Sequence, residues 1–269
     1  METLASLSPY WQTLLATTFT WLMTGLGASL IFFFKNIERK WFDFLLGTTA
    51  GVMISAAFWS LLTPAVEQSA LQLGKAWSWF PVATGFILGA AFIYGIDKVL
   101  PHIHIHEKAP EGPKTEWNHS ILLVLAITLH NLPEGLGLGI SYGAASLENA
   151  QLEIGSALAL TLGIGLQNIP EGLAVALPLK RAGLSSKACF FWGFMSAAVE
   201  PIGGIIGVLS VSYVSTLLPY ILAFAAGAMI FVVVEEVIPE TQKDRFADLA
   251  TLGFVLGFVV MMVLDLSLG

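Results

Sequence analysis

The sequence predicts an all-α integral membrane protein with eight transmembrane helices. Of its 269 residues, 56% are apolar and only 12% are charged, whereas a typical soluble domain carries about 25% charged residues. Eight apolar stretches each approach the roughly 20 residues that a helix needs to cross the hydrocarbon core. The apolar excess and the formal charge of −7 exclude a disordered chain and a nucleic-acid-binding protein.

The eight stretches follow one another with little sequence between them. Their continuous apolar runs lack the polar alternation of a barrel strand, so each is predicted as a helix in one transmembrane domain covering 1–269. The first stretch has no basic residue before Lys35, which argues against a cleaved signal peptide. The single Cys189 excludes a disulfide framework. In chain order the predicted spans are 11–34, 44–66, 81–100, 119–141, 156–178, 188–211, 219–240 and 248–267.

Basic residues in the short loops predict the orientation, because they gather on the cytoplasmic side. All of the 12 Lys and Arg residues except Lys75 fall on one side of the eight predicted spans. That side is therefore predicted to be cytoplasmic, and both termini are predicted to be extracytoplasmic. The basic residues on the cytoplasmic side are Lys35, Arg39, Lys40, Lys98, Lys108, Lys114, Lys180, Arg181, Lys187, Lys243 and Arg245.

The longest loop, 101–118, is predicted to be cytoplasmic and contains three alternating histidines, His102, His104 and His106. Short histidine tracts bind metal ions in many proteins. A polar, flexible connector is the alternative. The acidic residues that follow the histidines favour weak metal binding.

Two related motifs occupy the fourth and fifth predicted spans. The first reads HNLPEG over 130–135 and the second reads QNIPEG over 167–172. The two spans run in opposite directions, so the same motif lies at a similar depth in two antiparallel helices. This arrangement is typical of an inverted repeat, and transporters place their binding sites at such interfaces.

A second pair of similar segments supports the repeat. AGVMI at 50–54 in the second span recurs as AGAMI at 226–230 in the seventh, and Pro64 or Pro239 follows each of them. Those two spans are antiparallel as well. The two pairs together predict a 3+2+3 arrangement, in which spans one to three are the inverted counterparts of spans six to eight.

Three glutamates, Glu134, Glu171 and Glu200, lie inside predicted spans. A carboxylate in hydrocarbon costs about 2.5 kcal/mol or more on insertion scales, so each needs a partner or a function. No Lys or Arg lies in the middle of a span, which leaves few candidates for structural ion pairs. Protonated carboxyls in helix–helix hydrogen bonds are one alternative, and dissolved cations are the interpretation that we favour.

Helical spacing brings further ligands to the same face. His130 and Asn131 lie four and three residues before Glu134, and Gln167 and Asn168 bear the same relation to Glu171. If the two faces meet, each glutamate can bridge two adjacent positions. A two-cation site between spans four and five is therefore predicted.

Proline and the ligand types refine this hypothesis. Pro133, Pro170 and Pro201 lack amide donors, which frees backbone carbonyls near the acidic side chains. Imidazole together with carboxylates suits Zn²⁺, Fe²⁺ and Mn²⁺ better than Ca²⁺ or Mg²⁺. A thioether such as that of Met53 would favour softer ions, although a methionine within a span usually serves packing.

At these residues the sequence resembles the ZIP family of divalent-metal transporters, in its prokaryotic, GufA-like branch, over nearly the whole chain. The resemblance depends on the two motifs above, on the segment 195–203 with Glu200-Pro201, and on the segment 235–241. It implies eight helices with extracytoplasmic termini, a homodimer in the inner membrane of a prokaryote, and a binuclear centre between spans four and five.

Carried over by position, the resemblance implies two adjacent metal sites that share Glu134 and Glu171. The first adds His130 and Gln167 with Met53 nearby, and the second adds Asn131, Asn168 and Glu200. Many family members have His at the position of Gln167 and some have Asp at that of Asn168, so the two amides weaken the expected preference for Zn²⁺. The resemblance also implies a cytoplasmic exit relay, whose members would be Asp97, His102, His104, His106, Glu235 and Glu236. An acidic helix end next to Lys243 and Arg245 is the alternative interpretation of the Glu235-Glu236 pair.

The predicted function is therefore import of divalent ions into the cytoplasm, with Zn²⁺ first and Fe²⁺, Cd²⁺ and Mn²⁺ as further candidates. No catalytic cofactor is expected. An intramembrane metal-dependent hydrolase is the alternative, since the same ligands could activate water. The chain has neither HExxH nor GxSxG, which favours transport. A proton-coupled carrier of an organic substrate is a second alternative.

Overall fold

The computed structural model describes residues 6–33, 38–99, 119–147, 153–213, 215–242 and 245–268. Throughout these ranges the regular structure is helical, without any strand, which confirms the prediction of an all-α protein. The helices in chain order are α2 (Pro9–Ser29), α3 (Arg39–Ala56), α4 (Thr63–Leu73), α5 (Trp79–Val99), α6 (His119–Ala145), α7 (Ile154–Arg181), α8 (Ser186–Met195), α9 (Glu200–Tyr213), α10 (Leu218–Val232), α11 (Ile238–Thr241) and α12 (Ala247–Leu268).

Two π-helical segments join neighbouring α-helices into longer rods. Ala57–Leu62 connects α3 to α4, and Val233–Val237 connects α10 to α11. Each begins shortly after one of the two AGxMI segments at 50–54 and 226–230. Such π-segments insert an extra residue into a helical turn and are frequent at functional sites.

Seven helical segments in the described ranges are long and apolar enough to cross a membrane. They correspond to α2, the rod of α3 and α4, α5, α7, α8 with α9, the rod of α10 and α11, and α12. α6 is not one of these seven, although its 27 residues would extend about 40 Å at about 1.5 Å per residue.

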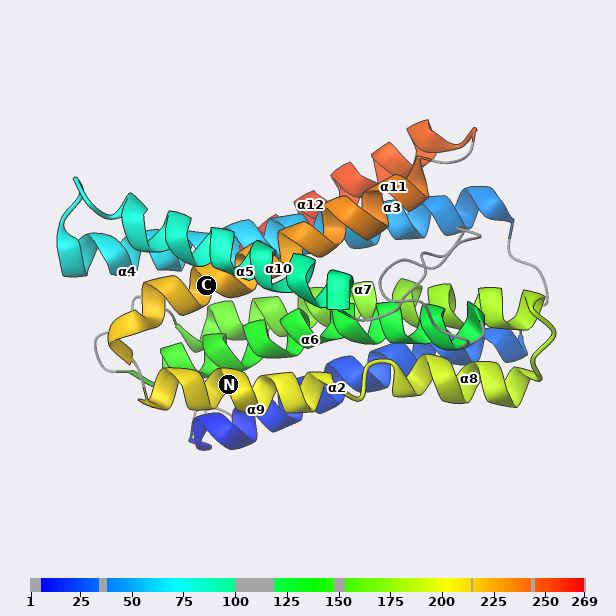
Figure 1. Cartoon of the computed structure of the whole chain (residues 1–269), viewed down its shortest axis with the longest axis horizontal. Coiled ribbons are helices and arrows are strands. Elements are labelled where there is room, and N and C mark those ends of the chain that lie inside the picture. Colours follow the sequence, from blue (N-terminus) through cyan, green and yellow to red (C-terminus); the bar gives the residue numbers. More distant parts are fainter. Residues whose placement is uncertain are drawn as a thin grey trace.

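The helices form two groups that meet along α6 and α7 (Figure 1). The first group contains α2, α6, α7, α8 and α9, and the second contains α3, α4, α5, α10, α11 and α12. In the first group, α2 packs along α7 while α9 packs along α6; in the second, α3 packs along α12 while α10 packs along α5. Contact between the groups is made mainly by α3 and α12 on α7 and by α10 on α6.

Glycines allow the helices within each group to approach backbone to backbone. A Cβ atom on Gly51 of α3 would collide with the backbone of α12 at Phe254, and one on Gly227 of α10 with the backbone of α5 at Phe86. Between the groups the glycines face side chains and not backbone: a Cβ atom on Gly137 would lie 3.7 Å from a Leu61 methyl, and one on Gly163 would collide with the sulfur of Met261. The two groups are thus tightly packed internally and meet through side chains, as small-residue packing in membrane helices permits.

Candidate metal centre

The two motif glycines bring α6 and α7 against α9 and α2. A Cβ atom on Gly135 would collide with the backbone at Glu200, and one on Gly172 with the backbone at Thr24. Each glycine directly follows a motif glutamate, so the close approach fixes the depth of Glu134 and Glu171 relative to the neighbouring helices. α6 and α7 continue through the motif prolines.

The sixth predicted span is interrupted near the motifs. α8 ends at Met195, four residues form turns, and α9 begins at Glu200. Pro201 cannot donate an amide hydrogen bond, and it disfavours helical geometry in the residue before it. The break leaves the carbonyl of Ser196 available, and the Asn131 side-chain amide donates to it at 3.2 Å.

Hydrogen bonds pair the amides with the carboxylates across helices. Gln167 Nε2 on α7 donates to Glu134 Oε1 on α6 at 2.5 Å. Asn168 Nδ2 donates to Glu200 Oε1 at 2.8 Å and to the carbonyl of Thr20 at 3.0 Å. The Thr20 hydroxyl donates to the other oxygen of Glu200. All of these side chains are at most 1% exposed, so their geometry is fixed inside the first helix group.

Five side-chain oxygens of the motifs remain buried and have no hydrogen-bond donor within the described ranges. They are Asn131 Oδ1, Glu134 Oε2, Gln167 Oε1, Asn168 Oδ1 and Glu171 Oε2. An unsatisfied buried oxygen costs about 1–3 kcal/mol, and more when it is charged. Five such atoms from two antiparallel motifs form an arrangement that a cation would neutralise.

His130 links the motif to the second helix group. Its Nε2 atom lies 3.5 Å from Glu236 Oε1 in the π-segment that follows α10. The structure therefore brings His130 and Glu236 together at the boundary between the two groups.

Further predicted site residues are Met53, Glu235 and the three histidines of the loop 101–118. Met53 is 1% exposed and belongs to an apolar cluster with Ala50, Ile93 and Ala228, which is the packing role expected of most such methionines. Glu235 is half-buried beside Glu236. The histidines His102, His104 and His106 lie outside the described residues.

The ligand set differs from a compact cluster of ionisable groups. Within the described ranges, no three His, Cys, Asp or Glu side chains are gathered closely enough to hold a metal ion by themselves. The amide oxygens of Asn131, Gln167 and Asn168 would have to complete the coordination. Such a set is rich in oxygen, which suits harder divalent ions better than a set of imidazoles does.

Sequence reasoning missed the threonines of α2. Four of them recur at helical spacing and are buried, and Thr20 holds Glu200. The signal was present as a polar stripe on an otherwise apolar span, with the spacing of one helix face. The four threonines are Thr13, Thr17, Thr20 and Thr24.

A second missed contact lies in the other helix group. Asp265, near the end of α12, accepts a hydrogen bond of 2.7 Å from Ser60 in the first π-segment. The two residues are 205 positions apart in the sequence, and both are buried. An acidic residue inside one of the two most apolar spans was the available signal, but nothing in the sequence identified its partner.

The chain is similar in sequence to proteins named as zinc transporters. A family profile described as "ZIP Zinc transporter" matches residues 114–265. The chain is 39% identical to the protein named zinc transporter ZIP11 of Homo sapiens, over 97% of this chain and 98% of that protein. It is 40% identical to zinc transporter GufA of Myxococcus xanthus, over 95% and 98%, and 38% identical to zinc transporter ZIPB of Bordetella bronchiseptica, over 91% and 78%.

Proposed function

Since the chain belongs to the ZIP family of zinc transporters, we propose that it imports divalent metal ions, Zn²⁺ first among them, into the cytoplasm. It is a membrane transporter and not an enzyme, because the relatives that it matches over nearly their whole length are named as zinc transporters. Fe²⁺, Cd²⁺ and Mn²⁺ are further substrates of the same charge.

The observation that carries the proposal is the set of five buried oxygens without donors. Glu134 and Glu171 supply two of these oxygens and would bridge two adjacent cations. His130 and Gln167 complete one site, and Asn131 and Asn168 complete the other. Glu200 accepts hydrogen bonds from Thr20 and Asn168, so it would position Asn168 and could still offer a lone pair to the second cation.

The proposed architecture has eight spans in a 3+2+3 inverted repeat, with α6 as the eighth span and both termini outside. The packing supports it: α2 with α7 repeats as α9 with α6, and α3 with α12 repeats as α10 with α5. The two π-segments occupy matching places in the second and seventh spans. A homodimer in the inner membrane of a prokaryote completes the proposal.

Transport would move the first helix group against the second. Tight backbone packing inside each group and side-chain contacts between them support such a motion. His130 and Glu236 face each other across the boundary, so a metal leaving the motifs would meet Glu236 and then Asp97. These acidic side chains form the described part of the proposed exit relay.

Flux in sealed vesicles tests this function. Purified protein in proteoliposomes should accumulate labelled Zn²⁺ well above protein-free vesicles, and internal chelator should increase the plateau. Calorimetric titration on the same preparation reports binding. Metal binding without any accumulation would reject transport and favour the hydrolase alternative.

The amide at position 167 is expected to tune selectivity. Gln167→His replaces an oxygen ligand by an imidazole nitrogen, which favours Zn²⁺ over Mn²⁺. We expect the ratio of Zn²⁺ to Mn²⁺ affinity to rise on the order of tenfold, the lower end of what tuning a metal ligand's surroundings achieves. Competition calorimetry measures the ratio. An unchanged ratio would show that residue 167 does not ligate the ion.

A further inference from the structure

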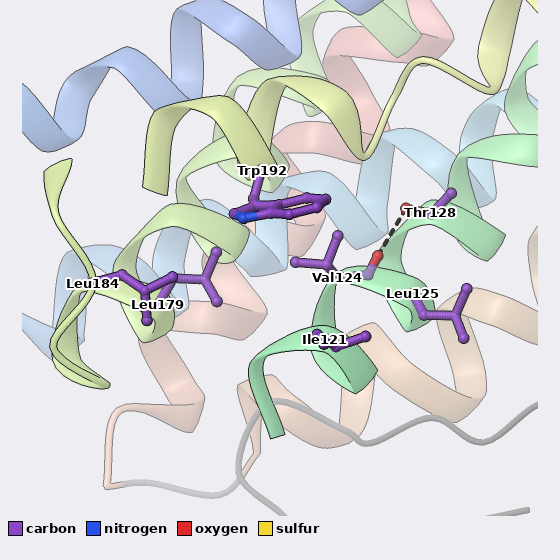
Figure 2. A pocket seen from close by; sticks show the side chains of 7 residues that line it. All are labelled: Ile121, Val124, Leu125, Thr128, Leu179, Leu184 and Trp192. Atoms are coloured by element: carbon purple, nitrogen blue, oxygen red, sulfur yellow. Dashed lines mark hydrogen bonds between the residues drawn. The ribbon is translucent and has the colours of Figure 1, made fainter. Parts of the chain in front are cut away.

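A cavity lies in the first helix group, and Thr128 in its lining lies two residues before the motif at 130–135. Its volume is about 550 Å³, within the roughly 300–1,000 Å³ typical of ligand pockets. Figure 2 shows it between α6, the end of α7 and α8, with Trp192 on one side and Val124 and Leu125 on the other.

The lining of this cavity is apolar. Thr128 carries its one hydroxyl, and that hydroxyl donates to the carbonyl of Val124 at 2.8 Å. The indole N–H of Trp192 has no acceptor within the described ranges, and in Figure 2 its nitrogen lies on the side of Leu179 and Leu184. The cavity therefore suits an apolar chain that carries a hydrogen-bond acceptor at the end nearer those two leucines.

The end of α7 forms the rim of the cavity. Gly183 has φ +92°, and its N–H bonds to the carbonyl of Lys180 at 3.1 Å while Leu184 N–H bonds to that of Leu179 at 3.2 Å. These bonds form a Schellman motif, in which the flanking apolar side chains pack together. The motif places Leu179 and Leu184 at the cavity, and Lys180 follows Leu179 in the last turn of α7.

The charged residues at this rim are all basic. Lys180, Arg181 and Lys187 lie at the helix ends that border the cavity, and within the described ranges no carboxylate pairs with them. Arg181 and Lys187 are exposed. The sequence from 172 to 199 contains no acidic residue. Basic residues at the cytoplasmic membrane surface attract anionic lipids.

The inverted repeat offers an internal comparison. Tyr142 follows His130 by the same 12 residues that separate Leu179 from Gln167. Tyr142 is 1% exposed, packs with Ala16 and Ala157, and makes a 3.0 Å hydrogen bond to Thr161. Both residues are 1% exposed, but only Leu179 also lines the cavity.

We propose that this cavity binds one acyl chain of an anionic phospholipid from the cytoplasmic leaflet, with the phosphate at Lys180, Arg181 and Lys187. The Trp192 N–H donates to the glycerol ester, as interfacial tryptophans do. The lipid is held by the helix group that also carries the metal motifs. The proposal depends on the proposed orientation in the membrane and not on metal transport.

Fluorescence of Trp192 tests the proposal. The full chain is placed in phosphatidylcholine bilayers containing equal fractions of either dibrominated phosphatidylglycerol or dibrominated phosphatidylcholine. The contribution of Trp192 among the eight tryptophans is the difference between the unchanged protein and Trp192→Phe. We expect its quenching to show a preference for phosphatidylglycerol of at least about tenfold, because each of the three basic residues contributes about 1 kcal/mol near an anionic surface.

Two sets of variants separate the head group from the chain. Lys180→Gln/Arg181→Gln/Lys187→Gln should abolish the preference, whereas the control Lys40→Gln/Arg245→Gln should keep it. Val124→Phe, or Leu125→Phe if the first does not fold, should fill the cavity and reduce quenching by both lipids. Equal quenching by the two lipids in the unchanged protein would overturn the proposal. Absence of quenching by either lipid would do so too, because protein would then cover the cavity.

Discussion

Replacing Glu171 by glutamine is expected to reduce metal uptake to background while leaving the metal-free protein at least as stable as before. Within the described ranges the Oε2 atom of Glu171 is buried without a donor, so removing the charge breaks no hydrogen bond at that oxygen. Glutamine has nearly the same shape and removes the cost of a buried charge. Glu134→Gln should behave alike, because glutamine Oε1 can still accept the hydrogen bond from Gln167.

The expected loss of metal affinity follows from the proposed role of Glu171 and Glu134 as bridging ligands. Loss of a group that only supports a ligand costs about 10–100-fold in metal affinity, so loss of a shared ligand should cost more than about 100-fold. Calorimetry and vesicle flux measure affinity and uptake, and thermal unfolding measures stability. Added Zn²⁺ at 100 times its dissociation constant should stabilise the unchanged protein by about 2.7 kcal/mol and leave the two variants unaffected.

Glu38→Gln is the matched control for these variants. Glu38 lies on the surface in a 2.7 Å ion pair with Lys40, and its side chain is 69% exposed, so the change removes a carboxylate that water already solvates. Such pairs contribute about 0–1 kcal/mol. Normal uptake by Glu171→Gln, with the control also normal, would contradict a shared ligand at that position.

The helical class and the two motifs were predictable because each depends on local sequence. Composition and the length of apolar runs identify membrane helices without knowledge of tertiary contacts. The spacing of His130, Asn131 and Glu134 fixes a common helix face, and the near repeat at Gln167 gives the partner. The structure brings Gln167 to Glu134 by a direct hydrogen bond.

The partners of Glu200 were beyond sequence reasoning. Thr20 is 180 residues away in the chain, and threonines in membrane helices usually bond to their own backbone carbonyls. Thr17 and Thr24 do so here, which makes Thr20 indistinguishable from them in the sequence. The expectation that Glu200 is a direct ligand stays a prediction, and its two hydrogen bonds indicate a positioning role as well.

Gly135→Ala is expected to destabilise the protein and weaken metal binding, although it removes no ligand. The added methyl would lie 2.7 Å from the Cα atom of Glu200, and the backbone of α9 cannot yield as a flexible side chain could. Overpacking of this kind costs about 1–3 kcal/mol or more, against a helix-propensity gain of at most about 1 kcal/mol. The thermal midpoint should therefore fall, and calorimetry should show weaker binding.

Alanine at two other glycines shows whether the close contact with α9, or the change from glycine to alanine itself, causes the loss. Gly95 in α5 has no atom within 4 Å of an added Cβ, so Gly95→Ala should raise stability by up to about 1 kcal/mol. Gly137→Ala would make ordinary contacts of 3.7 Å and 3.9 Å across the boundary between the groups and should raise stability by a similar amount, up to about 1 kcal/mol. If Gly135→Ala matched Gly95→Ala, the close approach of α6 to α9 would not hold the site. If only Gly135→Ala lost both stability and metal affinity, the close approach of α6 to α9 would be the contact that sets Glu134 at the depth of Asn168.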